Sequence, residues 1–220
     1  MNTTIIIPSY NQSEYLDKAI CSALLQPATI IVVDDGSTDN SLEIALKYQK
    51  YGVKVISQVN KGLASARNTG IMNADTDFIL PLDADDYLEP GAVSELENLI
   101  TTQNADIASG SFKCFGVSEA EVILGDPKLG DFITANRVGY CSLIRRSALL
   151  EIGGYNPKMV QGWEDWDVWI DLLKRGKKLV TTPRILWRYR TKENSMYTES
   201  VKHAETLSAQ MRKNHPEVYE

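Results

Sequence analysis

The chain has 220 residues, of which 43% are hydrophobic and 24% charged, a balance that excludes wholesale disorder and is typical of a globular domain. Its 23 basic residues are outnumbered by 29 acidic ones, which leaves a net charge of -6. Binding along a nucleic-acid backbone requires a basic face, so we expect no nucleic-acid partner. One small polyanionic ligand stays compatible with this charge if a metal ion neutralises it locally.

The cysteine and histidine content narrows the choice of metal and compartment. Three widely spaced cysteines without a CxxC pair favour neither a disulfide framework nor a zinc site, and they suit a reducing compartment. Because the histidines are only His203 and His215, a catalytic metal is expected to take oxygen ligands, as Mg²⁺ or Mn²⁺ does. No apolar run or signal-peptide pattern indicates a membrane span or export. We expect a cytoplasmic protein, with peripheral association at the inner membrane face as an open alternative.

The first hundred residues alternate between strand and helix patterns. Strands are predicted at residues 4–7, 29–33, 53–56 and 78–82, and helices at residues 16–24, 42–49, 63–72 and 93–100. Such alternation implies βαβ crossovers, and therefore a Rossmann-like α/β fold whose mostly parallel sheet carries helices on both faces.

The second half of the chain has a more irregular pattern. Residues 119–136 are polar and dotted with glycine, which predicts a loop. Further on, the patterns predict regular structure at residues 140–144, a short helix near Ala148, an extended segment at 181–189 and a polar helix at 200–213. Between the second and third of these, a further helix is predicted, with a buried face formed by Trp166, Trp169, Ile170 and Leu173.

Three of the predicted strands end in polar residues. These ends are residues 8–11, reading Pro-Ser-Tyr-Asn, residues 34–37, reading Asp-Asp-Gly-Ser, and residues 83–86, reading Asp-Ala-Asp-Asp. Open parallel sheets bind ligands at the carboxyl ends of their strands, and adjacent carboxylates there need a cation or hydrogen bonds. The alternative is that Asp34 and Asp39 are helix N-caps and residues 83–86 a solvated turn. This alternative accounts for one aspartate at each strand end, but it accounts poorly for five aspartates near one edge of the sheet.

Four segments together resemble glycosyltransferase family 2, in the family's order and spacing: residues 5–11, 32–39, 60–68 and 82–86. The resemblance spans residues 1–115 and resumes at residues 140–196. It implies a GT-A fold and inverting transfer of a sugar from a UDP- or GDP-linked donor to a hydroxyl of a glycan, lipid-linked or other acceptor, in cell-surface polysaccharide or glycan biosynthesis. It also implies a single catalytic domain, with a nucleotide-sugar-binding half at 1–115 and an acceptor-binding half with a carboxy-terminal tail at 116–220.

The resemblance also assigns roles on the donor side. It implies that Pro8 and Tyr10 line the base and ribose pocket and that Asp35 accepts a hydrogen bond from the base. Arg67 is implied to lie beside the base or the diphosphate. A structural ion pair with one of the aspartates is the alternative for Arg67, and the two roles are compatible.

The Asp-x-Asp spacing at Asp83 and Asp85 is expected to serve a metal ion. By resemblance, Asp83 contacts the ribose or a metal-bound water, and Asp85 ligates Mn²⁺ or Mg²⁺ that bridges the two phosphates. A bound metal stabilises the negative charge that develops on the leaving diphosphate.

Residues 162–167, reading Gly-Trp-Glu-Asp-Trp-Asp, open the predicted helix of the second half. The resemblance implies that Asp165 is the general base, which deprotonates the acceptor hydroxyl as it attacks the anomeric carbon opposite the diphosphate. Asp167 is the fallback, and Glu164 is expected to bind an acceptor hydroxyl. Trp163 is a candidate platform for stacking on a sugar. The plainer alternative is that these acids are ordinary residues of a first helical turn.

Residues 188–196 resemble a tail motif in which many relatives carry Tyr-Arg-x-His. Lys192 stands where that histidine stands, so this chain lacks a side chain that can complete the metal site in relatives. A protonated lysine cannot ligate a metal, but Lys192 and Arg190 can both pair with a diphosphate. We hypothesise a flexible lid over the donor; a solvated basic strand end is the alternative.

Three other functions are weighed against this one. A receiver-type signalling domain requires its acidic pair after the first strand and about half this length. A nucleotidyltransferase favours a glycine-rich loop with a basic residue near the amino-terminus, which residues 8–11 do not supply. A catalytically inactive module that binds nucleotide-sugars stays open.

Overall fold

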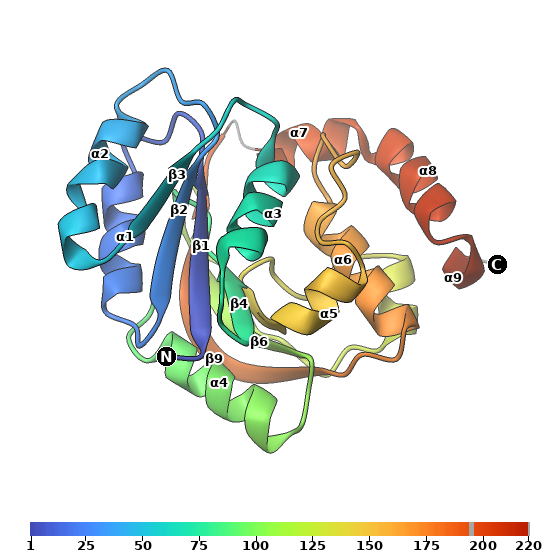
Figure 1. Ribbon diagram of the computed structural model, residues 1–220. Coiled ribbons are helices and arrows are strands. Elements are labelled where there is room, and N and C mark those ends of the chain that lie inside the picture. Colours follow the sequence, from blue (N-terminus) through green and yellow to red (C-terminus); the bar gives the residue numbers. More distant parts are fainter. Residues whose placement is uncertain (194–195, 220) are drawn as a thin grey trace.

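The computed structural model describes residues 1–193 and 196–219. Within them the strands form one curled sheet in the order β3-β2-β1-β4-β8-β6-β9-β5, with β7 paired to β6 (Figure 1). The strands are β1 Thr3–Ser9, β2 Thr29–Asp34, β3 Lys54–Ser57, β4 Phe78–Pro81, β5 Tyr87–Leu88, β6 Ile107–Gly116, β7 Glu121–Val122, β8 Ser142–Arg145 and β9 Leu179–Thr191. The helices are α1 Leu16–Leu24, α2 Ser41–Lys47, α3 Leu63–Asn73, α4 Ala92–Thr102, α5 Arg146–Glu151, α6 Glu164–Lys174, α7 Met196–Lys202, α8 Ala204–Asn214 and α9 Pro216–Tyr219, with short 3-10 helices at Gln49–Tyr51 and Leu129–Ile133.

The first four strands form the parallel part of the sheet, as the alternating pattern predicts. Strand β1 lies between β2 and β4, and β3 continues the parallel order beyond β2. Ser9 pairs with Asp34, and the amide of Leu82 donates to the carbonyl of Ile6, so the polar strand ends meet at one edge. The predicted gathering of these segments is therefore confirmed.

Helices cover both faces of the sheet. One core joins α1, α2 and α4 to one face, and a second joins α3, α5, α6 and α8 to the other. The apolar residues predicted to face inward on α1, such as Leu16 and Ile20, are fully buried. Trp169 and Ile170 on α6 are fully buried as well, so the periodicity identified the correct faces.

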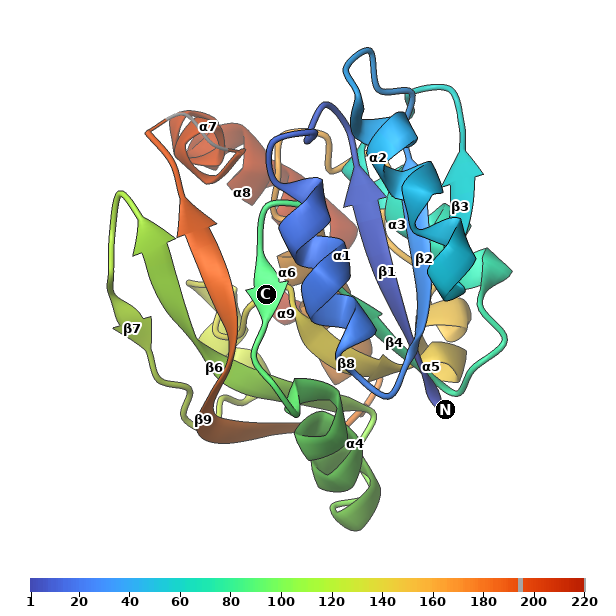
Figure 2. The same ribbon diagram turned by 90° about the vertical axis from the view of Figure 1, so that its left-hand side faces the viewer.

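The second half of the sheet is built from long-range pairings. Strand β8 runs antiparallel to both β4 and β6, and β9 runs parallel to β6 along Ile107–Gly116. Figure 2 shows β6 and β9 curving away from β1 and β2. Strand β9 then reaches β5, where Tyr87 pairs with Arg188, so its end returns to the turn that follows β4.

Several elements of the second half differ from the sequence expectation. Strands β5, β6 and β7 were not predicted; β6 contains small residues and glycines, and its Gly110 lies against the side chain of Leu186. The polar helix predicted at 200–213 is interrupted at His203, whose backbone angles are not helical, and is therefore divided between the end of α7 and α8; α9 lies beyond the predicted range. In the described part of the chain, no helix is both long and apolar enough to cross a bilayer.

Candidate active site

A cavity of about 630 Å³ opens at the carboxyl ends of β1, β2 and β4, a volume typical of small-molecule sites. Among the predicted site residues, its walls include Pro8, Tyr10, Asp35, Asp83, Asp85, Arg190 and Lys192. The structure therefore brings together donor-side residues from four separate segments. Figure 1 shows α7 at this same end of the molecule, and Met196 and Glu199 of α7 also line the cavity.

The two aspartates that follow β2 have different surroundings. The carboxylate of Asp34 is buried and accepts hydrogen bonds from the amide of Ser37 at 3.3 Å and the hydroxyl of Ser57 at 3.1 Å. Asp34 is thus a structural residue of the turn. Gly36 is required there, because it has a φ of 76° and a Cβ would lie 2.9 Å from the amide nitrogen of Asn60.

Asp35 is held by the loop that precedes α3. Its carboxylate accepts hydrogen bonds from the amides of Lys61 at 3.0 Å and Gly62 at 2.8 Å, and from Nε2 of Gln58 at 2.7 Å. Its own amide donates to the carbonyl of Ser9 at 2.8 Å. These bonds fix a carboxylate in the cavity wall, at the junction of β1, β2 and the loop.

Arg67 of α3 is buried and joins the two halves of the chain. Its Nη2 lies 2.7 Å from Oδ1 of Asp83, and its Nη1 lies 2.6 Å from Oε1 of Glu164. The guanidinium also lies over the rings of Tyr140 and Tyr155, at 5.3 and 5.1 Å from their centroids. The structural ion pair considered for Arg67 is therefore present. Arg67 is not among the described residues that line the cavity, and its guanidinium is connected to the cavity wall through Asp83.

Asp83 forms the cavity-facing end of this bridge. Burial raises the pKa of Asp83 to about 6. The positive charge of Arg67 lowers this pKa by less than burial raises it, and the negative charge of Asp85 raises it further. A cation that enters the cavity beside Asp83 favours its charged form, and an anion disfavours it.

Asp86 is a buried residue that organises the turn after β4. Its carboxylate accepts hydrogen bonds from the hydroxyl of Tyr140 at 2.5 Å and the amide of Arg190 at 2.6 Å. The same hydroxyl accepts from the amide of Asp83 at 3.1 Å. Burial, with repulsion from Asp85 next in size, raises the pKa of Asp86. Asp86 thus ties the end of β9 to the Asp83–Asp85 turn.

Asp85 and Lys192 face each other across the cavity wall. The Lys192 ammonium lies 2.7 Å from Oδ2 of Asp85, and it lies 4.3 Å from the centroid of the Tyr15 ring. Arg190 donates from Nε to the carbonyl of Asp85 at 3.0 Å, and its guanidinium lies over Tyr15 and Phe115. Both predicted basic residues therefore lie against the turn. Asn194 and Ser195, which belong to the same tail motif, lie outside the described residues.

The donor set of the turn suits a hard cation. Asp83 and Asp85 present carboxylate oxygens to the cavity, and Mg²⁺ or Mn²⁺ is held in many proteins by one or two carboxylates plus substrate phosphates. Within residues 1–193 and 196–219 there is no group of three or more His, Cys, Asp or Glu side chains placed to hold a metal. The residues therefore fit a metal that shares its coordination with a ligand.

The first turn of α6 carries the candidate base. Asp165 is half-buried; its Oδ2 accepts from Nδ2 of Asn136 at 2.8 Å and its Oδ1 from the amide of Trp166 at 2.8 Å. Burial raises the pKa of Asp165 to about 7, and the neighbouring Glu164 raises it further against the pull of Arg67. A carboxyl group in this range can take up a proton at neutral pH.

The neighbours of Asp165 differ from expectation in one respect. Glu164, expected to bind an acceptor hydroxyl, is 5% exposed and its carboxylate pairs with Arg67. Trp163 is half-buried, has a left-handed φ of 62° and packs on Trp166 with ring centroids 4.7 Å apart. A non-glycine residue in this conformation is uncommon and strained, as is frequent near binding sites.

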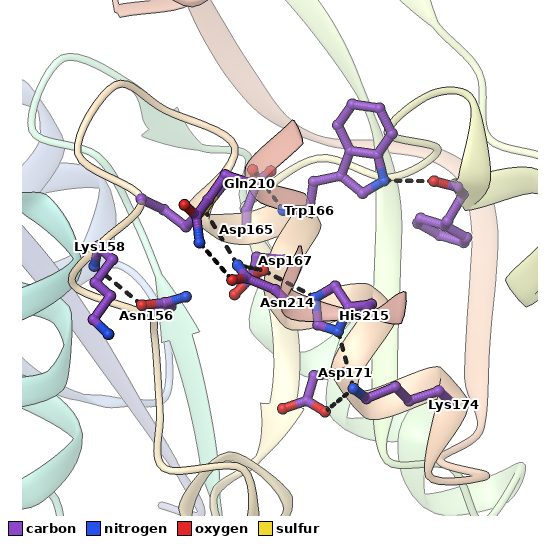
Figure 3. A network of polar contacts seen from close by, with 12 residues as sticks. Asn156, Lys158, Asp165, Trp166, Asp167, Asp171, Lys174, Gln210, Asn214 and His215 are labelled. Atoms are coloured by element: carbon purple, nitrogen blue, oxygen red, sulfur yellow. Dashed lines mark hydrogen bonds and ion pairs between the residues drawn. The ribbon is translucent and has the colours of Figure 1, made fainter. Parts of the chain in front are cut away.

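The remainder of α6 is anchored by the carboxy-terminal helices, as Figure 3 shows. Oδ1 of Asp167 accepts from Nδ2 of Asn214 at 2.7 Å and lies 2.9 Å from Nε2 of His215. Nδ1 of His215 lies 3.0 Å from Nζ of Lys174. Asp167 is 6% exposed and engaged in this network, so it is placed as an anchor and is a poor fallback for the base.

Sequence reasoning missed Asn136, Asp86, Tyr140 and Glu199. Asp86 lay inside the quoted motif, but a run of acids does not indicate which member points inward. Asn136 contacts Asp165 across 29 residues, and Tyr140 contacts Asp86 across 54. No local pattern marks such pairs, and only an inventory of polar residues at the ends of the irregular segment would have included Asn136.

The comparisons with known proteins identify the family and the fold of the chain. The family model for glycosyl transferase family 2 matches residues 4–153. Glycosyltransferase GlyA of Streptococcus pneumoniae is 39% identical over 131 residues, covering 56% of this chain and 19% of that protein. Cholesterol galactosyltransferase of Borreliella burgdorferi is 39% identical over 114 residues, covering 50% of this chain and 32% of that protein. The chain thus spans less than a third of these relatives' length.

Solved structures share the fold at low sequence identity. TarS of S. aureus in complex with UDP-GlcNAc superposes with a TM-score of 0.79 at 19% identity, covering 96% of this chain and 66% of that one. Mannosyltransferase PcManGT of Pyrobaculum calidifontis, in complex with GDP-Man and Mn²⁺, gives a TM-score of 0.71 at 16% identity, covering 94% of this chain and 61% of that one. These neighbours have GT-A folds, and the predicted fold class is confirmed. With its family model matched over most of its length, this chain belongs to glycosyl transferase family 2.

Proposed function

We propose that the chain is the catalytic domain of an inverting glycosyltransferase, which transfers a sugar from a UDP- or GDP-linked donor to an acceptor hydroxyl in glycan biosynthesis. The observation that carries the proposal is the Asp83–Arg67–Glu164 bridge. It links a cavity lined by carboxylates at the strand edge to Asp165, a carboxyl group with a pKa near neutral. A donor site and a base belong side by side in a displacement reaction.

The donor nucleotide is assigned to the strand-edge cavity. Pro8 and Tyr10 supply its apolar and aromatic wall at the end of β1, and Tyr10 is 46% exposed and available for stacking. Asp35 is held in place by two backbone amides and still presents lone pairs for a base N–H. Arg67 contributes indirectly, by setting the position and charge of Asp83.

A divalent metal is assigned to Asp85, with Asp83 as its neighbour on the ribose side. When bound, Mn²⁺ or Mg²⁺ supplies a positive charge that stabilises the leaving diphosphate. The buried Asp86 keeps the turn in place, because it holds both Tyr140 and the amide of Arg190. Arg190 and Lys192 contribute positive charge on the diphosphate side of the cavity.

Asp165 is assigned as the general base. It accepts the proton of the acceptor hydroxyl while that oxygen attacks the anomeric carbon from the face opposite the diphosphate. One displacement inverts the configuration, and the C–O bond to the diphosphate breaks as the new glycosidic bond forms. Asn136 and the amide of Trp166 orient the carboxylate, and Trp163 offers a ring beside it for the acceptor sugar. Glu164 supports the site through Arg67.

The test is a panel of UDP- and GDP-sugars incubated with Mn²⁺ and a mixture of sugar and lipid-linked acceptors. We expect release of UDP or GDP from one donor, and an anomeric configuration in the product, read by NMR, opposite to that of the donor. Asp165→Asn should bind the same donor and release no product. If the chain bound none of the donors, the proposal would be overturned. Release of pyrophosphate from a nucleoside triphosphate would instead identify a nucleotidyltransferase.

A further inference from the structure

The ion pair between Lys192 and Asp85 occupies the part of the cavity where a diphosphate is expected. The ammonium and the carboxylate are 2.7 Å apart, and their side chains are 26% and 25% exposed. Both side chains of the pair are thus half-buried. Its position in the wall leaves it accessible to a ligand in the cavity.

The other basic residue of the described wall, Arg190, is far more constrained. Its amide is bound to Asp86 and its Nε to the carbonyl of Asp85. Its guanidinium also stacks over Tyr15 and Phe115, at 4.2 and 4.5 Å from the ring centroids. Arg190 therefore acts as a fixed element of the turn. Lys192 carries its charge on a four-carbon arm and is the more mobile cation of the two.

The carboxylates of the wall also differ in how they are neutralised. Asp35 accepts three protein hydrogen bonds, Asp83 pairs with Arg67, and the exposed Glu199 pairs with Lys202 at 2.5 Å. Asp85 pairs with Lys192, whose ammonium lies 2.7 Å from Oδ2 of the carboxylate and 4.3 Å from the centroid of the Tyr15 ring. An ammonium has three N–H donors, so it can contact the carboxylate and phosphate oxygens at the same time. A lysine here can therefore bridge a carboxylate and an anion, as a divalent metal does.

We propose that, when no divalent metal is bound, Lys192 is a resident cation that bridges Asp85 and the diphosphate of the donor, so that the chain also binds a nucleoside diphosphate in the absence of metal. The inference rests on the proposed function for the class of ligand. A divalent metal bound to Asp85 would lie close to the Lys192 ammonium, and repulsion between the two cations disfavours their simultaneous binding. Metal and lysine therefore compete for Asp85, and Mn²⁺ binds the free protein weakly.

The first experiment is titration calorimetry of the whole chain with UDP and with GDP in the presence of EDTA. We expect one of the two to bind wild type, and Lys192→Met to lose about 10-fold or more in affinity, because a charge-assisted contact to phosphate is removed. Lys128→Met is the matched control, because this lysine is exposed on the loop of the second half and pairs only at the surface with Asp126. Its affinity should equal that of wild type.

The second experiment measures Mn²⁺ binding without nucleotide, by the loss of the free-ion signal in electron paramagnetic resonance. Lys192→Met should bind Mn²⁺ about 10-fold more tightly than wild type, because no ammonium competes for Asp85. Thermal unfolding of the variant verifies that the fold is retained. This readout is independent of nucleotide and of catalysis.

The outcomes separate the inference from the function. If wild type binds UDP or GDP only when Mn²⁺ is present, or if Lys192→Met binds equally well in EDTA, the resident-cation role is wrong while the proposed function stands. If neither nucleotide binds under any condition, the proposed function fails and this inference with it.

Discussion

The proposed donor side and the proposed acceptor side of the site are built in different ways. Asp35 on the donor side is held by amides and an amide side chain 23 to 27 residues away, within one βαβ neighbourhood. Glu164 on the acceptor side depends on Arg67, 97 residues distant, and Asp167 depends on His215 in the terminal segment. The donor side is thus organised locally, whereas the acceptor side requires the whole chain to be assembled. A substitution that loosens the carboxy-terminal half should therefore disturb the acceptor side and leave the donor side intact.

The largest effect is expected from Asp165→Asn, which separates the two sides functionally. We expect the transfer rate to fall about 1,000-fold, because the amide cannot accept the acceptor proton. Donor affinity, measured by calorimetry, should stay within about twofold of wild type, since the loss of one general base leaves ground-state binding intact. Asp126→Asn, at an exposed position of the second half, is the control. If Asp165→Asn retained transfer activity, the general base would have to be another residue.

Arg67→Met should produce the largest loss of stability, because it breaks the bridge between the two sides. Asp83 and Glu164 would be left without their cation, and removing one partner of a buried ion pair costs about 3–5 kcal/mol. Urea denaturation gives the free energy of unfolding. Lys128→Met should leave it unchanged within error, since surface pairs contribute little. Equal values for both variants would show that the bridge is energetically neutral.

His215→Ala tests whether the acceptor side alone depends on the terminal segment. Asp167 would keep Asn214 but lose the imidazole, a loss of about 1–3 kcal/mol for a buried carboxylate. Hydrogen exchange should accelerate in α6 and α8 and remain slow in β1 and β2. Equal acceleration in both regions would contradict the proposed asymmetry.

Asn136→Ala should give the smallest effect, visible as a change in the pH profile. Asp165 acts as a base only when ionised, so with a pKa of about 7 the transfer rate falls as pH drops below 7. The Asn136 amide donates to the carboxylate and favours its charged form, so that its loss raises the pKa of Asp165. We expect a rate about three- to tenfold lower at pH 6 and unchanged at pH 9. An unaltered profile would remove Asn136 from the site.

Sequence alone predicted the parallel half of the fold well, because its signals are local. Strands β1, β2 and β4 are short apolar runs, and helices α1 and α4 have a clear buried face. Strand β6 was not predicted because Gly110 and two serines interrupt its apolar pattern, although Leu186 packs over the glycine. Its partner β9 lies more than 70 residues away, and no local rule encodes such a pairing.

The site was predicted in its residue types more than in its contacts. The motif Asp34–Asp35 does not reveal that Asp34 faces the turn while Asp35 faces the cavity. The sequence also favours a metal as the balance for the acidic surplus. In the structure, Arg67 and Lys192 neutralise part of the negative charge of the site from within the protein.

The Arg67 bridge has a consequence for exchanging parts between relatives. A chimera that keeps residues 1–115 and takes its second half from another family member imports whatever residue stands at position 164. Without a carboxylate there, the buried guanidinium of Arg67 keeps Asp83 as its partner, and its Nη1 loses its acceptor. Acceptor halves are therefore interchangeable only in matched pairs, and position 164 is the first place to inspect when such a graft fails to fold.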